Sequence, residues 1–184
     1  MTLVTTPAWT ALDTVHLKHV LDAIHYSQII PDTPLKQFTT VQYLLGGIEP
    51  MAEGIACDVA LVDWLNTTIR QELAFHRQHY DLPIPELLAL RPHALNNLKS
   101  DFKQQNVELE AWSVLYFWYV RVDLALGWKG VAALAGQTTR NLRRRQAHGL
   151  HRLLHQLIQQ EMHSLQQVGA GSEIDDNKVI KVAI

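Results

Sequence analysis

Six cations stand in a stretch of chain that contains no carboxylate. Residues 124–160 carry a formal charge of +6, whereas residues 1–123 carry −6 and residues 161–184 carry −2. The six basic side chains are Lys129, Arg140, Arg143, Arg144, Arg145 and Arg152. Guanidinium groups bind phosphate and guanine through paired hydrogen bonds. The asymmetry therefore indicates an anionic partner for this one segment.

The same segment has the spacing of a helix-turn-helix across residues 128–147. Ala132 is the small residue needed where a second helix crosses close above the first, and Gly136, four residues later, suits a turn with positive φ. Leu142 then supplies the apolar side chain between the two helices. Thr138 is a suitable N-cap for the second helix.

The second helix is expected to have an apolar side and a basic side. The apolar side consists of Leu142, Leu150, Leu153, Leu154, Leu157 and Ile158. The basic side consists of Arg140, Arg144, His148, His151 and His155, with Arg152 beside them. Motifs of this kind meet base edges with the N-terminal end of the second helix. We therefore expect a nucleic-acid interface made by Lys129, Thr138, Thr139, Arg140, Arg143, Arg144, His148 and Arg152.

Within this interface, the candidates for phosphate contacts are Lys129, Arg140, Arg143, Arg144 and Arg152. The candidates for reading bases are Thr139, Arg140 and Arg143. The alternative explanation is a solvated basic face on a core helix, paired with the acidic remainder of the protein. Gln137 and Arg145 depart from the helix-turn-helix pattern, since both occupy positions where such motifs more often have aliphatic side chains.

The run Val131-Ala-Ala-Leu-Ala-Gly-Gln-Thr-Thr-Arg-Asn-Leu-Arg-Arg-Arg, continuing to Glu161, resembles the helix-turn-helix of sigma-factor region 4 and of LuxR-type regulators. It is more similar still to helical regions that precede the NTPase module in some bacterial signal-transduction (STAND) ATPases. With Tyr116 and Tyr119 upstream, the resemblance covers about residues 60–161. It implies an all-α module that binds DNA or acts as a protein-interaction adaptor. The chain has no Walker A sequence, so no NTPase activity is implied, and Gln146 replaces the usual aliphatic residue.

The rest of the chain predicts an all-α protein. Apolar residues recur at 3- and 4-residue spacing, and an alternating pattern occurs only in the last residues. Helices are expected over about 8–26, 35–45, 50–80 and 108–125, with short ones from residue 86 and after residue 92. In the helix over 50–80, one apolar face is expected to hold Met51, Ile55, Val59, Val62, Leu65, Ile69 and Leu73.

We expect a multi-helix bundle in three parts, with a C-terminal helix-turn-helix and a long final helix. Residues 1–127 form the N-terminal bundle, residues 128–168 the helix-turn-helix with a long C-terminal helix packed on it, and residues 169–184 a flexible tail. Within the tail, residues 179–184 are either disordered or a strand donated to a partner.

No catalytic or metal-binding motif is found. The chain has no Gly-rich phosphate loop, no G-x-S-x-G and no H-E-x-x-H, so we expect no enzyme activity and no cofactor. The histidine stripe at 148, 151 and 155 has no carboxylate nearby in sequence and predicts a surface feature rather than a metal site. Cys57 is expected to be a small buried hydrophobe. Trp112, Tyr116, Trp118 and Tyr119 are expected in the core.

These observations favour a cytoplasmic protein without a membrane segment. The chain has one cysteine, no signal-like start and no apolar run near the ~18 residues that span a membrane. Our first hypothesis is a helix-turn-helix protein that binds double-stranded DNA, a transcriptional regulator or sigma-like factor, with a homodimer suiting a palindromic site. The alternative is a non-catalytic protein-interaction adaptor in a bacterial signalling or defence complex. No small-molecule ligand is expected.

Overall fold

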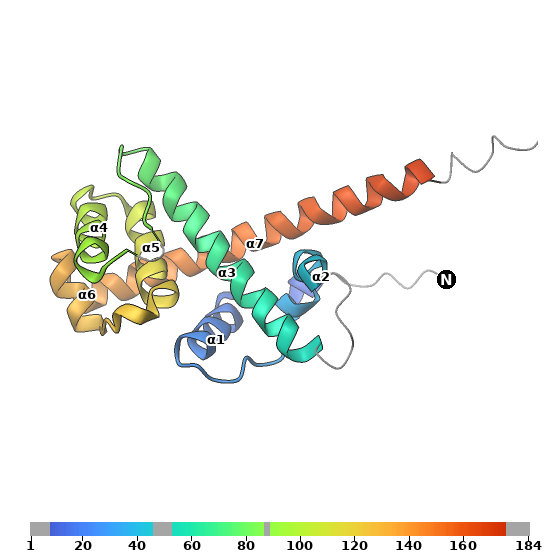
Figure 1. Cartoon of the computed structure of the whole chain (residues 1–184), viewed down its shortest axis with the longest axis horizontal. Helices are drawn as coiled ribbons and strands as arrows, with labels where there is room; N and C mark the ends of the chain where they lie inside the picture. Colours follow the sequence, from blue (N-terminus) through green and yellow to red (C-terminus); the bar gives the residue numbers. More distant parts are fainter. Residues whose placement is uncertain (1–7, 46–52, 87–88, 176–184) are drawn as a thin grey trace, which may run out of the picture.

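The computed structural model describes residues 8–45, 53–86 and 89–175, and its regular secondary structure there is entirely helical (Figure 1). The α-helices are α1 Thr14–His25, α2 Thr39–Leu45, α3 Glu53–Gln78, α4 Arg91–Lys103, α5 Val107–Leu115, α6 Trp128–Ala135 and α7 Thr139–Asp175. The prediction of an all-α protein is confirmed for the part of the chain that the structure describes. Within the described ranges, no helix combines the length and the apolar character needed to cross a membrane.

The first predicted helix, over residues 8–26, is divided into two pieces. A 3₁₀ turn covers Ala8–Ala11, and α1 begins at Thr14. Asp13 causes the break, because its Oδ1 accepts hydrogen bonds from the backbone N–H groups of Val15, at 2.9 Å, and His16, at 2.8 Å. A carboxylate in this position caps a helix start and directs the preceding chain away from the helix axis.

Two other helix predictions need correction. The expected helix over 108–125 is α5 followed by a π-helical turn, Tyr116–Val120, and a 3₁₀ turn, Val122–Leu124. The backbone N–H of Arg121 bonds to the carbonyl of Tyr116 at 3.0 Å, and the chain then turns at Ala125, where φ is 47°. The short helix expected from residue 86 is absent from the described residues there, and residues 87–88 lie outside them.

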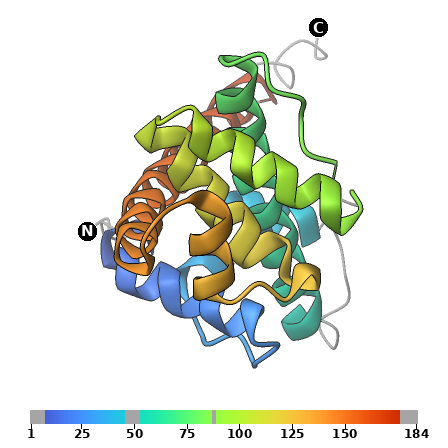
Figure 2. The ribbon, with the colours of Figure 1, turned by 90° about the vertical axis from the view of Figure 1, so that its left-hand side faces the viewer.

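Helix α5 forms the centre of the fold. Its residues from Leu109 to Leu115 are all buried, because α3, α4 and α7 pack around it (Figure 2). A helix that is enclosed on all sides is expected to be apolar around its circumference. The aromatic residues predicted for the core, Trp112, Tyr116, Trp118 and Tyr119, are confirmed there, each at most 7% exposed.

The predicted apolar face of α3 is wrong in its first turns. Ile55 and Val59 are 79% and 63% exposed. The buried residues at this end are instead Cys57, as expected for that residue, and Leu61, because α2 packs on this side of α3. Met51 lies outside the described residues. Further along, three of the predicted residues are fully buried: Leu65, Ile69 and Leu73.

A buried ion pair connects α3, α4 and α5. Nη1 of Arg77 lies 2.5 Å from Oδ1 of Asp101, and neither side chain has any exposed surface. Ser113 donates from its hydroxyl to Oδ2 of Asp101 at 2.8 Å, and Arg77 donates from Nε to the carbonyl of Pro83 at 2.7 Å. Because each charge has several partners, the pair holds the three helices in a defined arrangement.

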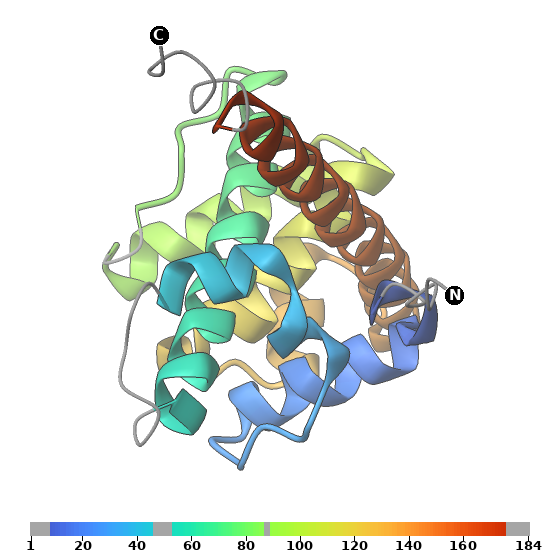
Figure 3. The same cartoon turned by 90° about the vertical axis from the view of Figure 1, so that its right-hand side faces the viewer.

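Helix α7 has 37 residues and is therefore about 55 Å long. It passes α5 and α1 with its first half and α2 further along, and its last turns project beyond the other helices (Figures 1 and 3). Buried Glu161 attaches it to α2, accepting hydrogen bonds at 2.9 Å from both the N–H and the hydroxyl of Thr39. The helix ends at Asp175 rather than near Val168, and residues 176–184 lie outside the described residues.

Candidate nucleic-acid interface

The turn between α6 and α7 uses the residues that the sequence singled out. Gly136 has φ 63° and ψ 30° and ends α6, in the conformation that favours glycine. Ala132 and Leu142 are 6% and 0% exposed, respectively. Oγ1 of Thr138 accepts a hydrogen bond from the N–H of Asn141 at 3.2 Å, which is the predicted N-cap contact. The two helices therefore meet through a small residue, a left-handed turn and a buried leucine.

Six of the eight predicted interface residues are exposed around this turn. They are Lys129 on α6, Thr138 in the turn, and Thr139, Arg140, Arg143 and Arg144 on the first turns of α7. The structure records no ion pair between any of these four cations and a described carboxylate. Their charges consequently remain available to an external anion.

The other two predicted interface residues contact a carboxylate of α5. Glu108 accepts from Nε2 of His148 at 2.8 Å and from Nε of Arg152 at 3.0 Å. Burial opposes ionisation of Glu108, but the hydrogen bonds and charges of His148 and Arg152 outweigh it, and the pKa of Glu108 is lowered. His148 and Arg152 are therefore close to the exposed arginines in sequence but lie in a different environment in space.

Arg145 is also paired with α5. Its Nε lies 2.6 Å from Oε2 of Glu110, whose side chain is only 5% exposed. This contact accounts for an arginine at a position that more often holds an aliphatic residue. The arginines of α7 are therefore of two kinds: Arg140, Arg143 and Arg144 have no ion pair with a described carboxylate, and Arg145 and Arg152 pair with glutamates of α5.

Sequence reasoning missed the two glutamates because they precede their partners on α7 by 35 to 44 positions. Glu108 and Glu110 are the only charged residues of α5, whose other members are mostly apolar and buried. Charged residues on a helix destined for the core must find partners. The sequence signal was therefore a pair of glutamates on a mostly apolar helix. The arginine segment, which has no carboxylates of its own, could supply their partners.

Gln146 occupies another position where an aliphatic residue was expected. It is buried and donates from Nε2 to the hydroxyl of Tyr119 at 2.7 Å, and Tyr119 donates to Oδ1 of Asp22 at 3.0 Å. Burial, together with Asp22, raises the pKa of Tyr119 above its ordinary value. The phenol therefore stays protonated and connects α7 to α1.

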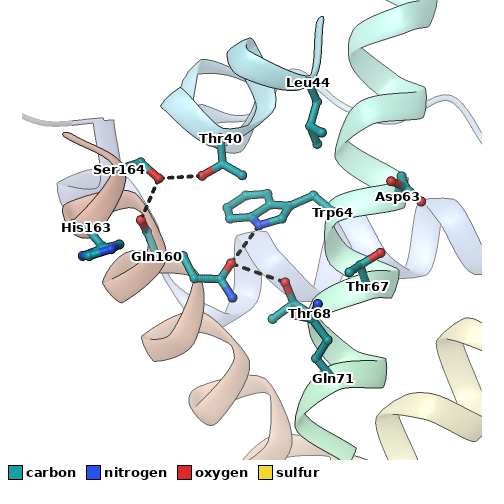
Figure 4. A pocket seen from close by; sticks show the side chains of 10 residues that line it. All are labelled: Thr40, Leu44, Asp63, Trp64, Thr67, Thr68, Gln71, Gln160, His163 and Ser164. Atoms are coloured by element: carbon teal, nitrogen blue, oxygen red, sulfur yellow. Dashed lines mark hydrogen bonds between the residues drawn. The ribbon is translucent and has the colours of Figure 1, made fainter. Parts of the chain in front are cut away.

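A hollow of about 360 Å³ lies between α2, α3 and the second half of α7 (Figure 4). Several of its polar side chains bind to each other. Oε1 of Gln160 accepts from Nε1 of Trp64 at 2.8 Å and from the hydroxyl of Thr68 at 3.4 Å, and Thr40 and Ser164 share a hydrogen bond of 3.2 Å. These hydrogen bonds join α7 to α2 and α3 across the hollow, whose lining contains no lysine or arginine.

Comparisons with protein-family models, with curated proteins and with solved structures found no match.

Proposed function

We propose that α6 and α7 form a helix-turn-helix that binds double-stranded DNA, as in a transcriptional regulator or sigma-like factor. The observation that carries this proposal is that neighbouring arginines of α7 lie in different environments. Arg140, Arg143 and Arg144 are exposed and unpaired among the described residues, whereas the neighbouring Arg145 is neutralised by Glu110. Exposed arginines without carboxylate partners gain most from binding phosphate or guanine.

In this proposal the first two turns of α7 enter the major groove. Arg140 and Arg143 have the side chains that bind guanine O6 and N7 in pairs, and Thr139 has a hydroxyl that binds either base type. Lys129 and Arg144 contact the phosphates on either side of the groove. Arg152 and His148 stay with Glu108 and support the helix instead of reaching the DNA.

The test is fluorescence anisotropy with a labelled duplex of mixed sequence at low salt. We expect wild-type protein to bind, and the triple variant Arg140→Ala/Arg143→Ala/Arg144→Ala to lose most of its affinity. The matched control, Arg70→Ala/Lys99→Ala/Lys103→Ala, removes three exposed cations of α3 and α4 and keeps the affinity of the wild type. Absence of wild-type binding contradicts the function, and equal losses in both triple variants contradict the site.

The second candidate function is an adaptor that binds an acidic protein surface. It is favoured by the projecting end of α7, where Met162 and Leu165 are each 41% exposed, a feature more typical of protein contacts than of DNA contacts. Polyglutamate serves as the acidic probe in the same anisotropy assay. Competition by polyglutamate at charge concentrations equal to those of duplex DNA favours the adaptor, and weaker competition favours DNA binding.

A further inference from the structure

A groove of about 450 Å³ lies between α1 and the start of α7, beside the proposed DNA contacts. Side chains from one face of each helix line it, together with Trp118 and Trp128. The residues that matter are Lys18, Asp22, Trp118, Trp128, Arg143 and Gln146. This volume is within the range of small-molecule sites, ~300–1,000 Å³. We propose that the groove binds a small molecule that combines a planar aromatic ring with an anionic group.

The charge of the groove selects an anion. Lys18 and Asp22 form an ion pair along α1, and the other oxygen of Asp22 accepts the hydroxyl of Tyr119 at 3.0 Å. Asp22 and Lys18 thereby compensate each other. Arg143 lines the same groove without a carboxylate partner among the described residues, so the groove has one uncompensated positive charge. A planar guanidinium binds a carboxylate through two parallel hydrogen bonds.

The apolar part of the groove selects a flat ring. Trp118 stacks on Trp128 with ring centroids 4.1 Å apart and on His25 at 4.8 Å, at interplanar angles of 25° and 13°. His25 is held in place by a hydrogen bond of 2.7 Å between its Nδ1 and the carbonyl of Trp118. This rigid aromatic stack, together with Ala147 and Leu150, gives an apolar wall next to Arg143. Both faces of Trp118 are covered in this stack, so the partly exposed Trp128 at its end is the ring that can stack on a planar ligand.

Arg143 belongs both to the groove and to the proposed DNA interface. Beyond the proposed function, a ligand in the groove would therefore regulate DNA binding. A ligand anion on Arg143 competes with DNA for the same guanidinium, so the ligand lowers DNA affinity. Binding to the groove itself requires no DNA. The two proposals can therefore fail separately, because the ligand is measured with the protein alone.

The experiment is isothermal titration calorimetry of the full chain with 2-naphthoate as the probe. Two comparison compounds have the same ring and a different charge, namely neutral 2-naphthylmethanol and cationic 2-naphthylmethylammonium. We expect saturable 1:1 binding of 2-naphthoate and much weaker binding of both comparison compounds. Arg143→Ala should weaken 2-naphthoate binding about tenfold or more, since it removes the charge-assisted hydrogen bonds to the carboxylate.

Ala147→Trp fills the groove from an exposed position of α7 and should abolish binding while the protein stays folded by circular dichroism. Arg70→Ala removes an exposed arginine of α3 outside the groove, and the affinity should remain that of the wild type. Three results overturn the proposal: no saturable binding of 2-naphthoate, equal binding of all three compounds, or an Arg143→Ala variant that binds as the wild type does.

Discussion

Arg144 and Arg145 are adjacent in sequence, and replacing each with alanine should have opposite consequences. Arg144 is exposed and has no ion pair with a described residue, so its guanidinium is available for the proposed DNA contact. Arg145 lies 2.6 Å from Glu110, a carboxylate that is 5% exposed in the centre of the fold. Arg144→Ala therefore tests binding, and Arg145→Ala tests stability.

The magnitudes follow from burial. Removing one partner of a buried ion pair costs about 3–5 kcal/mol, because it leaves an uncompensated charge. The Arg145 side chain is 31% exposed, so water reaches part of the pair and we expect a loss of about 2–3 kcal/mol. Substitution at an exposed surface site such as Arg144 changes the free energy of unfolding by less than about 0.5 kcal/mol.

Urea denaturation followed by tryptophan fluorescence measures the stabilities, and anisotropy with a labelled duplex measures DNA affinity. Arg144→Ala should keep its denaturation midpoint and lose affinity, and Arg145→Ala should lose stability and keep its affinity at temperatures where it is folded. The double variant Arg145→Ala/Glu110→Gln should recover part of the lost stability, because the uncompensated charge is then absent. An Arg145→Ala variant as stable as the wild type would refute the assignment of the two kinds of cation.

Three further predictions concern the scaffold. Gly149→Ala should lower the free energy of unfolding by about 1–3 kcal/mol, because its methyl group would meet the Ala111 carbonyl oxygen at 3.0 Å. The control in urea denaturation is Gly130→Ala, which should not destabilise the protein because nothing lies within 4 Å of the added methyl group. The pKa of Glu108 is lowered in the folded state, so its ionised form stabilises the fold at pH values above the ordinary pKa of 4.5. This stabilisation is lost as the pH falls through the folded-state pKa. Glu108→Gln should therefore flatten the acid side of the profile of stability against pH, measured by thermal melting. Asp101→Ala leaves a fully buried guanidinium without its carboxylate and should cost about 3–5 kcal/mol in urea denaturation, whereas a loss below about 1 kcal/mol would contradict the assigned role.

The features that could be predicted from sequence are those set by local physical chemistry. The left-handed turn at Gly136, the buried contact of Leu142 and the cap at Thr138 each follow from a residue type at a fixed spacing. The burial of the aromatic residues after α5 follows from hydrophobicity alone. Such features need no knowledge of which helices become neighbours.

The features that could not be predicted depend on distant pairs. Glu108 and Glu110 reach α7 only because α5 lies under it, so a segment free of carboxylates in sequence contacts two of them in space. Ile55 and Val59 belong to an apolar pattern but stay exposed, since the burial of that end of α3 is decided by where α2 packs. The groove beside Arg143 likewise needs α1, which precedes it by more than a hundred residues.

The salt dependence of DNA affinity tests the central claim most directly. If Lys129 and Arg144 each neutralise one phosphate, the logarithm of the affinity falls against the logarithm of the salt concentration with a slope of about −1.8, at ~0.9 per contact. The Arg140→Ala/Arg143→Ala/Arg144→Ala variant should then have a slope near −0.9. Equal slopes for wild type and variant would contradict the claim that Arg144 binds a DNA phosphate.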